Sequence, residues 1–199
     1  MSKKKLIDTL KTLSEVKEKT NGSFFTTGNL LVLNRNLTFL KDEKFVSIFK
    51  KLAENKQEQT RIWRVHIFLW AFINGLKLEG DLLECGVFKG FSSAVATQYT
   101  DFNSKKKVLY LFDTWDGIPQ DQLDPGRKDI DNYKDPSNYE KVKERFKSFK
   151  NVRIIKGRVP DVFEEIEMSK KISFLHLDMN SSTAEIGALE MLFDKMVRG

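Results

Sequence analysis

The sequence predicts an α/β domain with a parallel sheet, preceded by a helical N-terminal cap. Two observations carry this prediction. After Leu78, four apolar runs of strand length follow one another, and segments with helical spacing separate them. A glycine-containing turn joins the first of these runs directly to the helix that follows it. Strands that alternate with helices form parallel sheets with right-handed crossovers. We therefore expect a cap over residues 1–78 and a sheet domain over residues 79–199.

The expected cap consists of helices joined by a polar loop. Helical spacing covers residues 4–19, a Gly/Ser/Thr/Asn-rich loop covers residues 20–28, and a second helix covers residues 42–54. Residues 60–76 are apolar on most faces, which predicts a buried helix. For His66 in this helix, packing in a core is favoured over a role as a ligand.

The sheet domain is expected to contain four strands and the helices between them. The expected strands are residues 80–87, 106–113, 151–157 and 171–178. The expected helices are residues 91–99, 136–149 and 184–196, with a short helix or turn at residues 159–166. A polar, turn-rich insertion, residues 117–133, follows the second strand.

Composition limits the class of protein. The chain has 199 residues, of which 40% are hydrophobic and 31% charged, as in ordinary globular domains. Its single cysteine, Cys85, excludes an internal disulfide and fits a reducing compartment. No secretory signal or membrane span is visible, so a cytoplasmic location is expected. The net charge is +6, but the lysines lie scattered among acids, so no nucleic-acid partner is expected.

Each predicted strand ends in a small or acidic residue. These residues are Glu84 with Gly86, Asp113, Gly157 and Asp178. In a parallel sheet, ligands bind at the carboxyl ends of the strands, so these four ends are expected to form one site. Asp178 ends a strongly apolar strand, where a carboxylate requires a partner such as a metal, a lysine or a ligand.

The turn after the first strand narrows the class of ligand. A dinucleotide site needs a middle glycine that lets the backbone approach a pyrophosphate, but Phe88 and Lys89 stand there. Asp113 could accept hydrogen bonds from two ribose hydroxyls. This combination suits a mononucleoside with a compact polar tail, such as S-adenosylmethionine. Structural roles stay open for Glu84, as a carboxylate that caps backbone N–H groups, and for Asp113, as a turn former.

Four collinear segments resemble the macrocin O-methyltransferase (TylF/MycF-like) family. They are LEGDLLECGVFKGFSS, LYLFDTWDGIP, NVRIIKGRVPDVF and FLHLDMNSSTAEIGALE. The segment TRIWRVHIFLWAF is also similar to the helix that precedes the glycine turn in that family, so the resemblance covers residues 60–199. It implies a Rossmann-like class I methyltransferase sheet. It also implies magnesium-assisted transfer of a methyl group from S-adenosylmethionine to a hydroxyl, often on a sugar.

The resemblance also implies roles for single residues. Glu84, Gly86 and Gly90 would hold the methionine end of the cofactor, together with Val87 and Ser92 of the same segment. Asp113 would hold the ribose, and Thr114 and Trp115 would line the adenosine. Gly157 and Arg158 would border the adenine. Asp178 would be the catalytic residue and the first magnesium ligand.

Two departures from the family pattern affect the catalytic half of the expected site. Asn180 stands where many members have a second acid, and the sequence stops at Gly199, before a further strand with paired aspartates. We therefore expect a C-terminally truncated member with an incomplete magnesium site, whose fourth strand lies at an open edge. An alternative is a non-catalytic remnant that binds the nucleoside or a partner chain. A nicotinamide-dependent oxidoreductase is disfavoured by Phe88 and by the absence of a recognisable Tyr-x-x-x-Lys pair.

The acceptor is expected to be a small hydroxylated molecule. The insertion carries Asp121, Asp124, Arg127 and Asp131, which fits a polar acceptor. The sequence leaves assembly into a homo-oligomer open.

Overall fold

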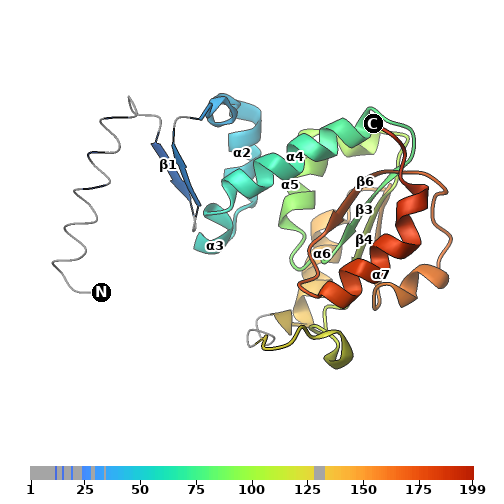
Figure 1. Cartoon of the computed structure of the whole chain (residues 1–199). Helices are drawn as coiled ribbons and strands as arrows, with labels where there is room; N and C mark the ends of the chain where they lie inside the picture. The colour runs from blue at the N-terminus through green and yellow to red at the C-terminus, as the bar shows by residue number, and fades with distance from the viewer. Residues whose placement is uncertain are drawn as a thin grey trace. The chain divides into compact units, whose positions relative to one another are not determined.

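The computed structural model describes residues 24–27, 30–33, 35–127 and 133–199, together with Thr12, Glu15 and Lys19. The chain forms two compact units, Met1–His66 and Ile67–Gly199 (Figure 1). Apart from the three isolated residues, the helix expected over residues 4–19 lies outside the described part of the chain.

The N-terminal unit contains a hairpin that the sequence reading missed. Strand β1 (Phe24–Thr27) pairs antiparallel with β2 (Leu30–Leu33), so the expectation of a loop is wrong at β1. Aromatic and β-branched residues favour strands, and this preference prevails over the turn-forming residues around them. A 3-10 helix, η1 (Thr38–Lys41), follows the hairpin.

Two helices complete the described part of this unit before α4. The second expected helix is confirmed as α2 (Glu43–Leu52). The side chain of Asp42 caps it by accepting a hydrogen bond from the backbone N–H of Phe45 at 2.9 Å. The short helix α3 (Lys56–Gln59) follows, capped in the same way by Asn55.

Aromatic rings surround His66. Phe39 stacks on the imidazole with ring centres 4.3 Å apart, and Trp63 lies edge-on to Phe39 at 5.4 Å. Burial lowers the pKa of His66, and the negative charge of Asp42 opposes this shift. His66 is therefore a packed histidine, as the sequence favoured.

The lowered pKa of His66 makes a prediction about stability. The pKa of His66 is lower in the folded chain than its ordinary value of about 6.5, so near and below that pH the imidazole takes up protons on unfolding. The unfolded state then binds more protons, so the free energy of unfolding should decrease as the pH falls from 7 toward 5. In His66→Phe this part of the decrease should disappear. Urea unfolding of both proteins at pH 7 and pH 5, followed by tryptophan fluorescence, measures the difference. An equal decrease in the free energy of unfolding in the two proteins would contradict the assignment of this effect to His66.

Helix α4 (Ile62–Leu76) confirms the expected third helix but is not fully buried. Phe68 and Phe72 pack edge-on against Phe174 of the sheet, with ring centres 5.3 and 5.5 Å apart. Trp70, in contrast, is 63% exposed, and Ile67 is also exposed. The expectation of burial was wrong for this face because an all-apolar helix does not indicate which of its sides the rest of the chain covers. Within the described residues, no helix is long and apolar enough to cross a membrane.

The C-terminal unit is built on a four-stranded parallel sheet, and all four expected strands are confirmed. They are β3 (Asp81–Cys85), β4 (Leu109–Asp113), β5 (Val152–Lys156) and β6 (Ile172–Leu177). Their spatial order is β5-β4-β3-β6, so β6 lies at an edge as expected. The α-helices between and after them are α5 (Phe91–Tyr99), α6 (Ser137–Phe146) and α7 (Ser182–Leu192). The 3-10 helices are η2 (Phe102–Ser104), η3 (Gln120–Gln122), η5 (Asp161–Glu164) and η6 (Phe193–Lys195).

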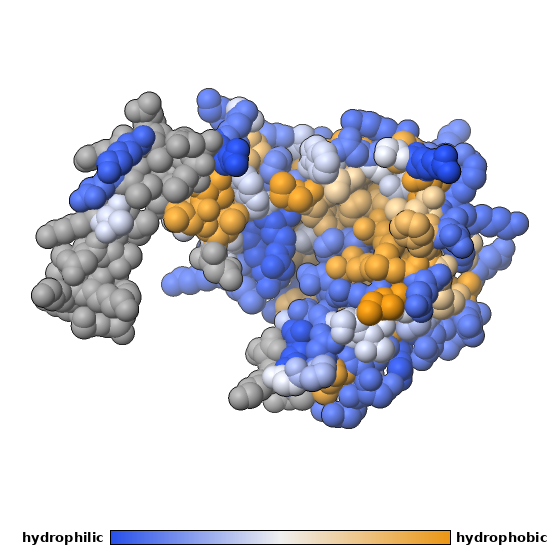
Figure 2. Space-filling model, in the orientation of Figure 1, coloured by the Kyte–Doolittle hydropathy of each residue, from blue (hydrophilic) through white to orange (hydrophobic). Residues whose placement is uncertain are grey.

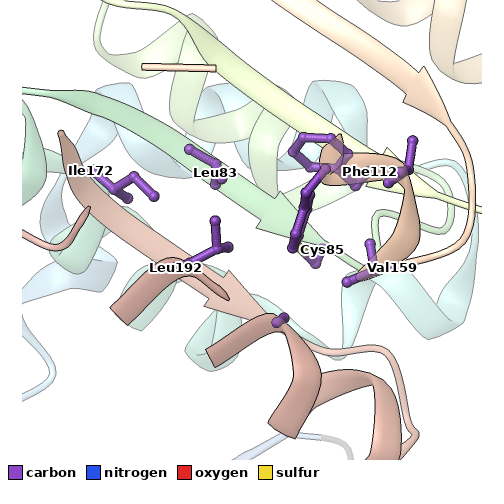
Figure 3. Packing of buried hydrophobic residues seen from close by; sticks show 9 residues of the cluster. Leu83, Cys85, Phe112, Val159, Ile172 and Leu192 are labelled. Carbon is purple, nitrogen blue, oxygen red and sulfur yellow. The ribbon is translucent and has the colours of Figure 1, made fainter. Parts of the chain in front are cut away.

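Apolar layers cover both faces of this sheet. On one face, Leu83 and Cys85 of β3 lie in a buried cluster with Ile172 of β6 and Leu192 of α7 (Figure 3). Burial raises the pKa of the Cys85 thiol, which confirms its reading as a small buried apolar residue. On the other face, Phe72 meets Phe102 and Phe174. Residues that alternate along β3 therefore face two different layers.

Candidate functional site

The carboxyl ends of the four strands meet at one edge of the sheet. Cys85 of β3 is in register with Phe112 of β4 and with Leu177 of β6, and Asp113 is in register with Lys156 of β5. The polar and small residues that follow these strands therefore lie at the same edge, as the sequence predicted.

The glycine turn between β3 and α5 is shaped by packing within the chain. Gly86 has φ +90°, and a Cβ there would lie 2.2 Å from the backbone oxygen of Asp178. Gly90, with φ +67°, is the residue before α5, and a Cβ there would meet the ring of Phe146 at 2.9 Å. The two glycines thus let the turn pass close to β6 and α6, which sequence reasoning had not considered.

Asp113 holds this turn in place. One carboxylate oxygen accepts the backbone N–H of Phe88 at 2.7 Å, and the other accepts the backbone N–H of Trp115 at 2.8 Å. Burial raises the pKa of Asp113, and hydrogen bonds from backbone N–H groups, including that of Val87, oppose the rise. An ionised carboxylate has about four acceptor sites, so these three backbone donors leave about one site for a ligand hydroxyl.

Trp115 closes the same loop from its other side. Its indole Nε1–H donates to the backbone oxygen of Phe88 at 2.8 Å, and the side chain is 1% exposed. Thr114 donates its hydroxyl to the backbone oxygen of Gly117 at 2.6 Å. The loops after β3 and β4 are therefore joined into one unit at the strand ends.

Glu84 lies on the opposite face of β3 from Cys85. Its carboxylate is 4% exposed, and Oε2 accepts a short hydrogen bond from the hydroxyl of Ser93 in α5. Its Oε1 lies 3.3 Å from Nδ1 of His176, the residue in register with it on β6. Sequence reasoning missed both Ser93 and His176. The register of β3 with β6 brings His176 to Glu84, and no local pattern in the sequence reveals that register.

Gly157 and Arg158 connect β5 to the insertion and to η5. A Cβ on Gly157 would lie 2.4 Å from the side chain of Val162, so the glycine permits close packing of η5. Arg158 forms two hydrogen bonds with the carboxylate of Asp121, at 3.2 and 2.6 Å, and an ion pair with Asp161 at 3.2 Å. Its guanidinium therefore binds two acids of this chain.

The described part of the insertion is anchored on the start of α7. Ser181 donates its hydroxyl to the backbone oxygen of Gln122 at 2.6 Å, and Ser182 donates its backbone N–H to Asp124 at 3.1 Å. Arg127 donates to the backbone oxygen of Asn180 at 2.7 Å. The insertion therefore borders the carboxyl end of β6, next to the expected catalytic edge.

Asp178 directly follows the carboxyl end of β6. It is exposed, and its backbone N–H donates to the oxygen of Cys85 at 2.9 Å. Among the residues that the structure describes, no group of three or more His, Cys, Asp or Glu side chains could hold a metal ion. Magnesium is usually bound through one or two carboxylates, with water or substrate oxygens completing its octahedron, so Asp178 would be at most one of its few protein ligands.

Comparison with known proteins places this geometry in a family. The family defined as macrocin O-methyltransferase (TylF) matches residues 59–199. No curated protein sequence matches the chain significantly.

Two solved structures share the fold. The O-methyltransferase NovP aligns with a TM-score of 0.51 at 19% identity over 68% of this chain and 61% of NovP. The calicheamicin methyltransferase CalS11 aligns with a TM-score of 0.54 at 13% identity over 87% of this chain and 81% of CalS11. The chain thus spans less than two thirds of NovP.

The family match covers the whole described site, from the glycine turn through Asp113 to Asp178. The two structural alignments support the parallel sheet that presents it. The chain therefore belongs to the macrocin O-methyltransferase family.

Proposed function

We propose that this chain binds S-adenosylmethionine at the turn between β3 and α5 and serves the methylation of a hydroxyl on a small polar, sugar-like acceptor. The observation that carries the proposal is the position of Asp113. Its carboxylate sits at the carboxyl end of β4, is hydrogen-bonded to the glycine turn, and keeps an acceptor site for a ribose hydroxyl. Membership of the family supports the same cofactor and the same reaction.

The residues around Asp113 suit a nucleoside with a charged tail. Gly90 directly precedes α5, whose first backbone N–H groups would face the carboxylate of the cofactor's methionine end. Ser92 lies in the first turn of this helix. Thr114 and Trp115 continue from Asp113 and would border the adenosine. Glu84 binds Ser93, so we assign it to holding α5 beneath the methionine end rather than to direct contact.

The bound cofactor would supply a methyl group already activated by its sulfonium. The contribution of this chain is then to orient the cofactor and to keep the glycine turn in one position. Correct positioning lowers the activation barrier for transfer between two bound molecules. Asp113 and Trp115 perform this task by fixing the backbone of Phe88 from two sides. We derive no step through magnesium, since the described residues contain no group of three or more candidate metal ligands.

A second candidate function is binding of the nucleoside or of a partner chain without turnover. It is favoured by the position of Asp178, which is exposed and has no cluster of further metal-binding side chains around it among the described residues. A methyl transfer that needs a metal would then depend on carboxylates from elsewhere.

Calorimetric titration combined with a transfer assay tests both functions. We expect S-adenosylmethionine and S-adenosylhomocysteine to bind, and NAD not to bind. Transfer of a labelled methyl group from S-adenosylmethionine to a panel of free and nucleotide-linked sugars, with and without magnesium, then separates the two candidates. Binding with transfer supports the enzyme, and binding without transfer supports the second candidate. Absence of cofactor binding would contradict the enzyme and the nucleoside-binding form of the second candidate, and would leave only binding of a partner chain.

A further inference from the structure

A buried carboxylate connects β6 to the start of α5. Glu84 is 4% exposed, and the described chain offers its oxygens a partner on each side. The hydroxyl of Ser93, in the first turn of α5, donates to Oε2, and Nδ1 of His176 lies 3.3 Å from Oε1. The register of β3 with β6 places His176 directly beside Glu84. Glu84 therefore joins the strand that leads to Asp178 with the helix that follows the glycine turn.

The surroundings of this pair are apolar. The ring of Phe68 in α4 lies edge-on to the imidazole of His176, with ring centres 4.9 Å apart, and Ser93 is fully buried. In the space-filling view, hydrophobic surface gathers around β6, where Figure 1 shows the strand beside α4 (Figure 2). A carboxylate in such surroundings is costly unless it is paired. The orientation of the Glu84 carboxylate therefore depends on both of its partners.

We propose that His176 is a positioning residue for the methionine end of S-adenosylmethionine, an inference that rests on the proposed function. Its Nδ1 holds the carboxylate of Glu84, and Glu84 holds Ser93 and with it the first turn of α5. The backbone N–H groups of that turn are the ones proposed to face the carboxylate of the cofactor. His176 thus acts through Glu84 and not by contact with the cofactor.

Loss of the imidazole should affect one end of the ligand only. Without His176, the buried carboxylate of Glu84 must turn toward water or draw Ser93 out of place, because a buried charge that loses a partner is strongly unfavourable. Either movement alters the first turn of α5. Asp113, in contrast, is held by the backbone N–H groups of Phe88 and Trp115, so the ribose end of the ligand should bind as before.

Calorimetric titration with two ligands tests this inference. S-adenosylhomocysteine carries the amino and carboxylate groups of the methionine end, and methylthioadenosine lacks them. We expect His176→Leu to weaken binding of S-adenosylhomocysteine by about 10-fold, as for the loss of one hydrogen bond, and to leave binding of methylthioadenosine unchanged. His176→Asn should restore most of the lost affinity, because its amide N–H can take the place of Nδ1–H. Each variant is titrated at a temperature where unfolding measurements show it to be folded.

Ser173→Ala is the matched control on the same strand. Ser173 is buried at the amino end of β6, where its hydroxyl lies 3.2 Å from the backbone oxygens of both Gly80 and Asp81. Its loss should lower stability and leave both affinities unchanged. Ser93→Ala interrupts the proposed link at its other end, so it should also weaken S-adenosylhomocysteine selectively. Added to His176→Leu it should cost little more, since both act through Glu84.

The outcomes separate this inference from the proposed function. If the wild type binds neither ligand, the proposed function fails and the role of His176 fails with it. If the wild type binds S-adenosylhomocysteine but His176→Leu loses affinity for both ligands equally, or for neither, the positioning role alone is overturned. It is also overturned if His176→Asn binds as weakly as His176→Leu. Should His176→Leu not fold, Ser93→Ala decides, because an equal loss for the two ligands would break the link between Glu84 and the methionine end.

Discussion

Replacing Gly86 by alanine should lower the free energy of unfolding by at least about 3 kcal/mol, within the range of severe single substitutions. Two effects add. The new Cβ would lie 2.2 Å from the backbone oxygen of Asp178 and 2.5 Å from its carbonyl carbon, so β3 and β6 must separate at their carboxyl ends. The backbone of Gly86, at φ +90°, is also unfavourable for a residue with a side chain. Urea unfolding at 25 °C measures the loss.

Gly126→Ala is the matched control for this experiment. Gly126 has a similar φ, +78°, but a Cβ there would have no other atom within 4 Å. The control therefore reports the backbone effect alone, which should be about 1–2 kcal/mol. If the two variants lose the same stability, the close contact between Gly86 and Asp178 does not constrain the site.

The cofactor half of the site could be predicted because its signals are local. Asp113 and Gly86 each follow an apolar run of strand length, and the carboxyl ends of parallel strands must meet at one edge. The resemblance to the family added roles for these residues, and the match over residues 59–199 confirms the family itself. The individual contacts of these residues with a cofactor remain predictions.

Other features depend on contacts between distant segments. Ser93 and His176 surround Glu84 only because α5 crosses β3 and because β6 pairs with it in one particular register. The anchoring of Gln122 and Asp124 on the start of α7 likewise joins segments that no periodicity connects. Packing also decided the exposure of Trp70, since the helical pattern around it is apolar on nearly every side.

Asp113 has a structural role, which is to hold the glycine turn, and a proposed role in binding the ribose. Its replacement by alanine should have large effects on both. Two backbone N–H groups, those of Phe88 and Trp115, would lose their acceptor in a partly buried loop. Leaving one such group unsatisfied costs about 1–3 kcal/mol, so the loss of both acceptors should lower the free energy of unfolding by about 2–6 kcal/mol. Asp116→Ala is the control: its carboxylate is exposed and pairs with Lys156 at 3.0 Å, and a surface pair contributes at most about 1 kcal/mol.

Calorimetry with S-adenosylhomocysteine then separates the structural role of Asp113 from its proposed contact with the ribose. The titration is made at a temperature where unfolding measurements show Asp113→Ala to be folded. Loss of the proposed ribose contact should weaken binding by about 1–3 kcal/mol, or roughly 5- to 150-fold, while Asp116→Ala binds like the wild type. If stability falls but the affinity of the folded variant is unchanged, Asp113 holds the turn and the ribose lies elsewhere. If Asp113→Ala unfolds like the Asp116 control, the hydrogen bonds to Phe88 and Trp115 do not carry the loop. A loss of both stability and affinity would show that the Asp113 carboxylate holds the turn and also binds the ribose. Its oxygens would then contact the backbone and the ligand together.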